Sequence, residues 1–358
     1  MTMLLAAFLA PFTIALAQDT PQAGPGVVIR STTSLVQVRV VAEDAKGNPV
    51  ADLTREDFQV QDDRKPQPVT LFSAERGGAL PPAAPSAASE PAPVQKAGEY
   101  ALILLDWLNT NYADRYNSRQ HLLDLLKSYQ TRQRVAIYLL AREPRLIHDF
   151  TTDMAELAQA VEDAGLEPAD MGPDSAPGRF DARYGARTGP PAAVEEQLFF
   201  LNNRVNDSFH TLELIADRLA RLPGRKSLVW LTAAFPLLLR GGTSYYQNME
   251  TLLARLNRGD VAVYPIDARG LTISSTGYPG TMEQLSERTG GVTFTGRNDI
   301  DTGIRMALED MRVSYILGFH VPAGAAPGLH EIRVKVGRPG VRLRYRESYQ
   351  LAPPAPVR

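Results

Sequence analysis

An aspartate, an amide and a hydroxyl follow directly on a short apolar run in the first half of the chain. The run covers residues 100–105, and Asp106, Asn109 and Thr110 stand at its end. A short apolar run without alternation predicts a strand buried on both faces, as in a parallel sheet covered by helices. Ligands of such sheets bind beyond the carboxyl ends of the strands. Because Mg²⁺ takes oxygen ligands of these types, the residues indicate a ligand-binding edge and a candidate metal site.

A second polar group is predicted to lie at the same edge. Asp267 and Arg269 come directly after the apolar run 261–266. Arg269 has the reach to bind a partner's carboxylate, but it can also pair with Asp267 and brace the loop, and we favour bracing. Trp107 would be an interaction anchor if it is exposed, whereas it would pack under the following helix if it is buried. The sequence leaves both alternatives open.

Composition and motifs exclude several classes of function. The chain of 358 residues has no cysteine, which rules out disulfides, thiolate metal sites and cysteine nucleophiles. Its formal net charge is −2 and no basic run stands out, so we expect no nucleic-acid partner. No serine-hydrolase elbow, phosphate loop or dinucleotide fingerprint is present, and we predict that the protein is not an enzyme. The histidines lack metal-ligand spacing, and we expect surface or interface roles for His121, His148, His210, His320 and His330.

Strand-like and helix-like patterns alternate over residues 98–312. Several short apolar runs, among them 228–231, predict strands, and helical apolar faces lie between them. This alternation predicts an α/β domain with a mostly parallel sheet flanked by helices. Arg225 and Lys226 precede one strand, at the opposite edge, and are expected to be solvated. At about 166–192 the pattern dissolves into Gly, Pro, Asp and Arg, which we interpret as a flexible insertion.

The two ends of this region are flanked by β patterns. Residues 27–76 are predicted to form a small antiparallel module, and residues 313–350 carry further strands, two of them joined in a hairpin across Arg338-Pro339-Gly340. Neither end has enough strands for a stable sheet of its own. We therefore predict that both ends meet in one β-sandwich with the α/β domain inserted between them. Residues 77–97, rich in Pro, Ala and Ser, are predicted to be a linker.

The start of the chain predicts export. Residues 4–16 are almost entirely apolar, and Ala15-Leu16-Ala17 forms a small-x-small cleavage site, so residues 1–17 are interpreted as a signal peptide. An uncleaved membrane anchor is the weaker alternative, because the run is short and contains Pro11. No other segment is predicted to cross a bilayer. We expect a periplasmic or secreted protein.

Several motifs together resemble a known family. These are Asp57-Phe58 with Val60, LILLDWLNT at 102–110, LPGRKSLVWL at 222–231, VAVYPIDARGL at 261–271 and YILGF at 315–319. In this order and spacing the chain is similar to the exported von Willebrand factor type A–related proteins common in acidobacteria. The resemblance runs from about Ser34 to Tyr349. It implies a Rossmann-like α/β fold and, as in type A domains generally, a metal-ion-dependent adhesion site at the carboxyl edge of the sheet.

The family's adhesion site matches this chain only in part. Its first loop reads Asp-x-Ser-x-Ser, of which Asp106 and Thr110 match the first and third polar positions and Leu108 supplies no ligand atom at the second. Thr211 is the candidate for the threonine of the second loop, with Ser208 close by. Where the family has Thr-Asp-Gly, this chain has Thr232-Ala233-Ala234, so the second carboxylate is absent. The resemblance thus implies a degenerate site, and Asp106 is favoured to cap the following helix or to bond loop amides.

The combined prediction is an exported, non-enzymatic binding, adhesion or scaffold protein. Its expected partner is a protein or a cell-surface polymer, no cofactor is expected, and the oligomeric state is left open. One alternative is Mg²⁺-dependent adhesion through Asp106, Thr110 and Thr211. The other is an exported hydrolase on the α/β scaffold, which rests on fold analogy alone.

Overall fold

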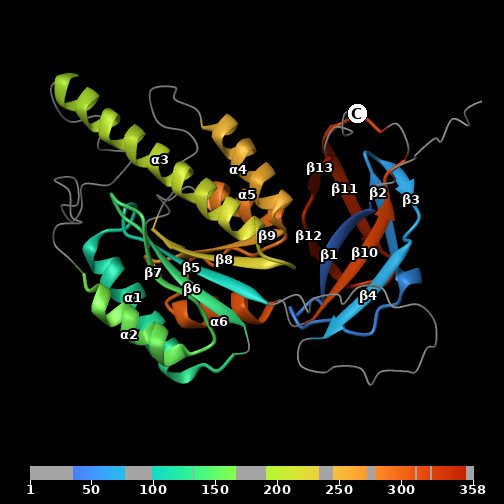
Figure 1. Ribbon diagram of the computed structural model, residues 1–358, viewed down its shortest axis with the longest axis horizontal. Coiled ribbons are helices and arrows are strands. Elements are labelled where there is room, and N and C mark those ends of the chain that lie inside the picture. Colours follow the sequence, from blue (N-terminus) through green and yellow to red (C-terminus); the bar gives the residue numbers. More distant parts are fainter. Residues whose placement is uncertain are drawn as a thin grey trace, which may run out of the picture.

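The computed structural model describes residues 35–76, 99–131, 133–166, 191–233, 245–271, 279–310, 313–322 and 325–351 (Figure 1). The predicted signal peptide 1–17 and linker 77–97, and nearly all of the insertion 166–192, lie outside the described residues. An α/β part and a part built only of strands lie side by side in Figure 1. No helix within the described ranges is long and apolar enough to span a membrane.

A mostly parallel sheet forms the centre of the α/β part. The strand order is β7-β6-β5-β8-β9, with β7 antiparallel to β6 and the other neighbours parallel. The strands are β5 (Tyr100–Asp106), β6 (Arg134–Leu140), β7 (Arg145–Thr151), β8 (Lys226–Thr232) and β9 (Val261–Asp267). Every residue of β5, β8 and β9 is buried, which is why these runs are apolar throughout instead of alternating.

Helices cover both faces of this sheet. The helices are α1 (Tyr112–Ser128), α2 (Met154–Ala164) and α6 (Ile300–Glu309) on one face, and α3 (Pro191–Ala220), α4 (Tyr246–Arg258) and α5 (Pro279–Thr289) on the other. Alternate side chains of β5 point to opposite faces. Ile103 packs in one apolar cluster with helices α1, α2 and α6, and Leu104 packs in another with helices α3, α4 and α5. The predicted α/β class with a mostly parallel, helix-flanked sheet is confirmed.

The chain changes direction at the centre of the sheet. From β5 it passes through α1 to β6 on one side, and it later returns to β8 on the other side of β5. The carboxyl ends of β5 and β8 therefore flank the topological switch point, where open α/β sheets bind ligands. Asp106 and Thr232 are the last residues of these two strands.

The strand part consists of two four-stranded sheets with the orders β12-β1-β10-β4 and β13-β11-β2-β3. Its strands are β1 (Leu35–Glu43), β2 (Phe58–Asp62), β3 (Lys65–Gln67), β4 (Leu71–Arg76), β10 (Val313–His320), β11 (Gly328–Val336), β12 (Arg342–Tyr345) and β13 (Ser348–Leu351), with a 3₁₀ turn at Arg55–Asp57. Strands from the two ends of the chain pair in both sheets, as Val38 does with Leu317 and Val60 with Val334. A single apolar cluster contains residues of both sheets.

The predicted hairpin across residues 338–340 is wrong. β11 pairs with β2 and β13, whereas β12 pairs with β1 in the other sheet. The segment Arg338-Pro339-Gly340 therefore carries the chain from one sheet to the other. Proline and glycine are found both in hairpin turns and in crossovers between two sheets, so these residues do not tell one connection from the other.

Arg344 joins the two parts of the molecule, and two further cations, Arg225 and Lys226, are buried within the α/β part. Arg344 of β12 pairs with Glu43 of β1 and with Asp310 at the end of α6. Arg225 and Lys226 are buried instead of solvated as predicted, because their side chains donate to backbone carbonyls, 2.7 Å from Arg225 Nη2 to Gly290 and 2.6 Å from Lys226 Nζ to Gly224. Burial lowers the pKa of Lys226.

Candidate functional site

The carboxylate of Asp106 lies at the switch point and is surrounded by donors. Oδ1 accepts from the backbone N–H of Asn109 at 2.9 Å. Oδ2 accepts from Thr232 Oγ1 at 2.7 Å and from Trp230 Nε1 at 3.1 Å, both across the boundary between β5 and β8. Asp106 is only 1% exposed. Its side chain therefore ties together the ends of two strands, and the prediction that it bonds loop amides agrees with this geometry.

The side-chain amide of Asn109 is the fourth donor. Its Nδ2 lies 3.1 Å from Oδ1 and 2.9 Å from Oδ2 of Asp106, and 2.9 Å from Ser208 Oγ on α3. Ser208 donates its own hydroxyl hydrogen to the carbonyl of Arg204, so it must accept from Asn109. This fixes the orientation of the amide, with its nitrogen towards the carboxylate. The positively polarised NH₂ group thus lies between an aspartate and a serine.

The electrostatics of Asp106 combine two opposing effects. Burial away from water raises the pKa of the carboxyl group, because the charged form loses its hydration. The hydrogen bonds from Asn109, Thr232 and Trp230 lower it, because each of them favours the ionised form, but burial is the larger effect. Mg²⁺ binds oxygen acceptors, whereas the groups arranged around this carboxylate are donors.

The hydroxyls of the other two predicted metal ligands, Thr110 and Thr211, both bond to backbone groups. Thr110 Oγ1 accepts from the backbone N–H of Ala233 at 3.2 Å and so holds the β5 loop to the β8 loop. Thr211 Oγ1 donates to the carbonyl of Asp207 in its own helix at 2.9 Å. The contact from α3 to the β5 loop comes from Ser208, which is nearly one helical turn before Thr211. Both residues point to the same side of the helix, so their spacing alone did not identify the contacting one.

Asp267 and Arg269 form a braced pair, which is the alternative favoured from the sequence. Arg269 Nε and Nη2 donate to the two carboxylate oxygens of Asp267 at 2.9 and 2.7 Å, and the backbone N–H of Arg269 donates to the same carboxylate at 3.0 Å. The hydrogen bond to Asp267 is the main cause of a raised pKa of Arg269. The guanidinium is therefore engaged within its own loop.

The large apolar side chains exposed at this edge do not include Trp107, the candidate anchor named from the sequence. Trp107 is buried in the apolar cluster beneath α1, so the packing alternative holds and the anchor alternative is wrong. Tyr112 and Tyr116, in the first turns of α1, are 42% and 52% exposed. Leu271, which follows the carboxyl end of β9, is 68% exposed. These three side chains belong to no polar motif, so the sequence alone does not single them out.

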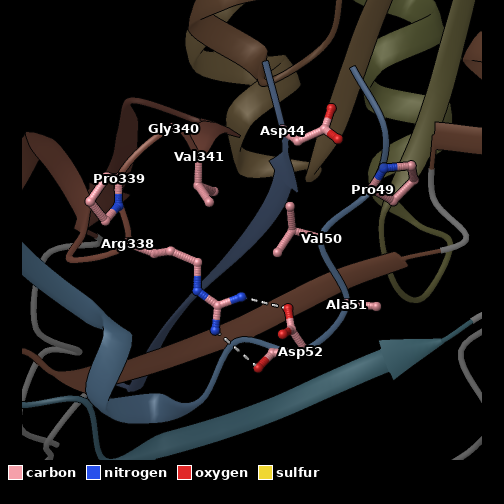
Figure 2. Close-up of a pocket in the computed structure, with 9 residues that line it drawn as sticks. All are labelled: Asp44, Pro49, Val50, Ala51, Asp52, Arg338, Pro339, Gly340 and Val341. Atoms are coloured by element: carbon pink, nitrogen blue, oxygen red, sulfur yellow. Dashed lines mark hydrogen bonds and ion pairs between the residues drawn. The ribbon is translucent and has the colours of Figure 1, made fainter. Parts of the chain in front are cut away.

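A separate hollow of about 640 Å³ lies on the strand part, away from the switch point (Figure 2). Asp44, Val50, Asp52, Arg338 and Val341 are among its lining residues. Arg338 Nη1 donates to Asp52 Oδ1 at 2.6 Å, so these two charges neutralise each other, whereas the Asp44 carboxylate accepts from the backbone N–H groups of Lys46 and Asn48. The lining has no nucleophile–base pair, and the hollow is wide open to solvent.

No protein-family model and no curated protein matches this sequence. Among solved structures, similarity is found to an aerotolerance-related membrane protein from Bacteroides fragilis (TM-score 0.37, 12% identity, 60% of this chain and 100% of that one). BatB from Bacteroides thetaiotaomicron gives a TM-score of 0.33 at 12% identity, over 59% and 97% of the two chains. The ArnB paralog VWA2 from Sulfolobus acidocaldarius gives 0.34 at 10% identity, over 90% and 77%. Likeness at this level does not establish a shared function.

Proposed function

We propose that this protein is an exported, non-enzymatic binding or scaffold protein whose α/β part presents the carboxyl edge of its sheet without a metal ion. The observation that carries the proposal is the donor shell of Asp106. Four donors from Asn109, Trp230 and Thr232 already engage both carboxylate oxygens. An ion would have to displace the Asn109 amide, and Mg²⁺ gives up its own waters reluctantly.

Partner binding is assigned to the exposed side chains around this closed centre. Tyr112 and Tyr116 on α1 and Leu271 after β9 are large apolar groups at the edge where α/β sheets bind ligands. Tyrosine contributes a large contact area with a polar tip and is enriched at interface hot spots. The partner class that fits is a protein or a cell-surface polymer, in keeping with the export signal predicted for residues 1–17.

The strand part is assigned the role of a carrier. We propose that the two four-stranded sheets form one β-sandwich made by both ends of the chain, with the α/β part inserted between β4 and β10. The shared apolar cluster and the cross-pairing of β1 with β10 and of β2 with β11 support this. The Arg344 pairs to Glu43 and Asp310 would hold the inserted part in a fixed orientation.

Thermal unfolding with and without Mg²⁺ tests the metal-free edge. A ligand at one hundred times its Kd raises the stability of the folded state by about 2.7 kcal/mol. We expect that Mg²⁺, Mn²⁺ or Ca²⁺ causes no shift in the unfolding temperature that depends on the carboxylate of Asp106. A concentration-dependent shift with Mg²⁺ that vanishes in Asp106→Ala, Thr110→Val and Thr211→Val would instead establish metal-dependent adhesion through these three residues.

A binding assay tests the assigned surface. The immobilised chain is incubated with cell-surface and secreted fractions of the source cells, in EDTA and in Mg²⁺. We expect retention that is equal in both buffers and is lost in the Tyr112→Ser/Tyr116→Ser variant. Leu329→Ser, which removes an exposed apolar side chain from β11 in the strand part, is the matched control. Retention that needs Mg²⁺, or that survives loss of both tyrosines, contradicts the proposal.

A further inference from the structure

Three potential metal ligands from distant parts of the sequence meet at one end of the strand part. Asp62 ends β2, Asp63 begins the turn to β3, and His330 lies on β11. His330 Nδ1 is 2.9 Å from Asp63 Oδ2 and 3.4 Å from Asp62 Oδ1, and one ligand atom from each residue lies within 4.8 Å of the others. The sequence predicts a surface or interface role for His330, but its side chain is buried in the structure.

Hydrogen bonds hold each of the three side chains in place from outside the cluster. Tyr349 donates its hydroxyl to Asp62 Oδ2 at 3.1 Å and stacks on the ring of His330. The backbone N–H of Glu331 donates to Asp63 Oδ1 at 2.9 Å. The turn gives Asp63 a φ of +46°, a left-handed conformation that aspartate tolerates better than most residues. In metal sites, such outer contacts orient the ligands.

The tautomer of the neutral His330 ring leaves its inward nitrogen, Nδ1, as a free acceptor. Nε2 lies 2.7 Å from the carbonyl oxygen of Ala326, which can only accept, so Nε2 carries the hydrogen. In the neutral ring Nδ1 then presents its lone pair to the two carboxylates. This is the arrangement of metal-binding histidines, whose second nitrogen typically donates to a carbonyl or carboxylate.

Two of the converging atoms are buried and have no hydrogen-bond partner among the described residues. They are Asp62 Oδ1 and His330 Nδ1, on side chains that are 6% and 9% exposed. Asp63 Oδ2 is near Nδ1, but the approach does not have hydrogen-bond geometry. Two acceptors facing each other without a donor are costly, because an unsatisfied buried polar group loses about 1–3 kcal/mol. A cation between them would remove that cost.

We propose that Asp62, Asp63 and His330 form a binding site for a divalent transition-metal cation of the Zn²⁺ class. Ligands about 2.0–2.1 Å from an ion lie about 3.0 Å apart at octahedral angles and about 3.4 Å apart at the tetrahedral angle. The observed separations of 2.9 and 3.4 Å match this range. Two carboxylates balance the charge of a dication, and the imidazole favours Zn²⁺ over Mg²⁺ or Ca²⁺.

The bound ion would act as a clip between the two ends of the chain. β2 belongs to the N-terminal strands and β11 to the C-terminal ones, and the ligands in them are more than 260 positions apart in the sequence. With three protein ligands, a tetrahedral ion keeps one position for water. Since the site lies on the strand part, its occupancy is independent of the switch point and of the binding function proposed above.

Calorimetric titration of the tag-free, EDTA-treated chain with ZnCl₂ tests the site. We expect one Zn²⁺ per chain for the wild type and binding more than about 100-fold weaker for Asp63→Asn, because a lost ligand should exceed the 10–100-fold effect of an outer-shell change. Asparagine retains an acceptor for the Glu331 N–H and favours positive φ, so this variant keeps the turn. Asp52→Asn, an exposed carboxylate in the same part, is the matched control and should bind as the wild type does.

Cobalt substitution gives a second readout that does not depend on affinity. The visible spectrum of bound Co²⁺ should show a nitrogen–oxygen site in the wild type and in Asp52→Asn, and it should be lost in His330→Gln. His330→Gln also replaces Asp63→Asn in the titration if the latter does not fold, as judged by circular dichroism in EDTA. Absence of Zn²⁺ binding by the wild type overturns the proposal, and so does binding that Asp63→Asn and His330→Gln leave unchanged.

Discussion

Removal of the Asp106 carboxylate measures whether it supports the fold or is reserved for a ligand. In Asp106→Ala the four donors around the carboxylate lose their acceptor in a buried environment. One unpaired buried donor costs about 1–3 kcal/mol. The donors are neighbours, and those of Asn109 can turn to other partners, so the costs are not additive. We expect a total loss of about 4 kcal/mol, which is large for a single substitution.

The assay is unfolding in urea and by heat, in EDTA, followed by tryptophan fluorescence, to which Trp230 contributes as a direct partner of the carboxylate. For a part of this size a loss of 1 kcal/mol lowers Tm by about 2–4 °C, so the expected fall is about 8–16 °C. Thr110→Val leaves one buried N–H unpaired and should cost about 1–2 kcal/mol. Thr211→Val, whose hydroxyl bonds within its own helix, should cost less than about 0.5 kcal/mol.

The order of these three effects separates the two interpretations. If the residues were metal ligands with little structural role, all three variants would unfold like the wild type in EDTA and would differ only in Mg²⁺. A loss below about 1 kcal/mol for Asp106→Ala in EDTA would refute the donor-shell reasoning, because it would mean that the donors have other partners.

Three further predictions follow from the described residues. Because burial raises the folded-state pKa of Asp106, the folded protein binds more protons than the unfolded chain between the two pKa values, and this contribution to stability is lost as pH rises through the folded pKa. In urea titrations the difference in the free energy of unfolding between the wild type and Asp106→Asn should therefore become smaller from about pH 4 towards neutrality. A difference that grows over this range would contradict a raised pKa of Asp106. Arg344→Met leaves Asp310 without its guanidinium and should cost about 3 kcal/mol, part of which Asp310→Asn should restore in the double variant; additive losses would show that the two do not interact. Gly291→Ala would place a Cβ 1.9 Å from a β9 carbonyl oxygen and should cost more than about 2 kcal/mol, whereas Gly296→Ala, at φ +66° with open space around it, should cost about 1 kcal/mol in the same unfolding assay; equal losses would contradict this reasoning.

The sequence predicted those features that depend on local patterns. Residues 100–105 of β5 form an unbroken apolar run because both faces of the strand are covered, and this pattern predicts Asp106 at the carboxyl end of a buried strand. The pairing of Asp267 with Arg269 was also accessible, since two residues of opposite charge and suitable length stand two positions apart. In both cases the deciding contacts lie within one element and its loop.

Features that depend on packing between distant elements were missed. Arg225 and Lys226 look like solvated cations by charge alone, but carbonyl groups of neighbouring turns satisfy them inside the molecule. Ser208 and Thr211 share a helix side, so only the position of α3 over the β5 loop selects Ser208. His330 was judged by its spacing to nearby residues, whereas its neighbours Asp62 and Asp63 come from the other end of the chain. No local pattern contains this information.

The balance of donors and acceptors explains why two buried aspartates on this chain receive opposite assignments. The ends of β5 and β8 bring an indole, a hydroxyl and an amide to one point, and these donors require an acceptor there whether or not an ion is present. Asp106 meets that requirement, so its presence at the edge is not in itself a sign of a metal. Around Asp62 the balance differs: Tyr349 donates to Oδ2, but Oδ1 faces only acceptors, the lone pair of the neutral His330 ring and the carboxylate of Asp63. A buried carboxylate whose neighbours are also acceptors needs a positive charge or a proton beside it, and this is why the proposed metal site lies on the strand part and not at the switch point.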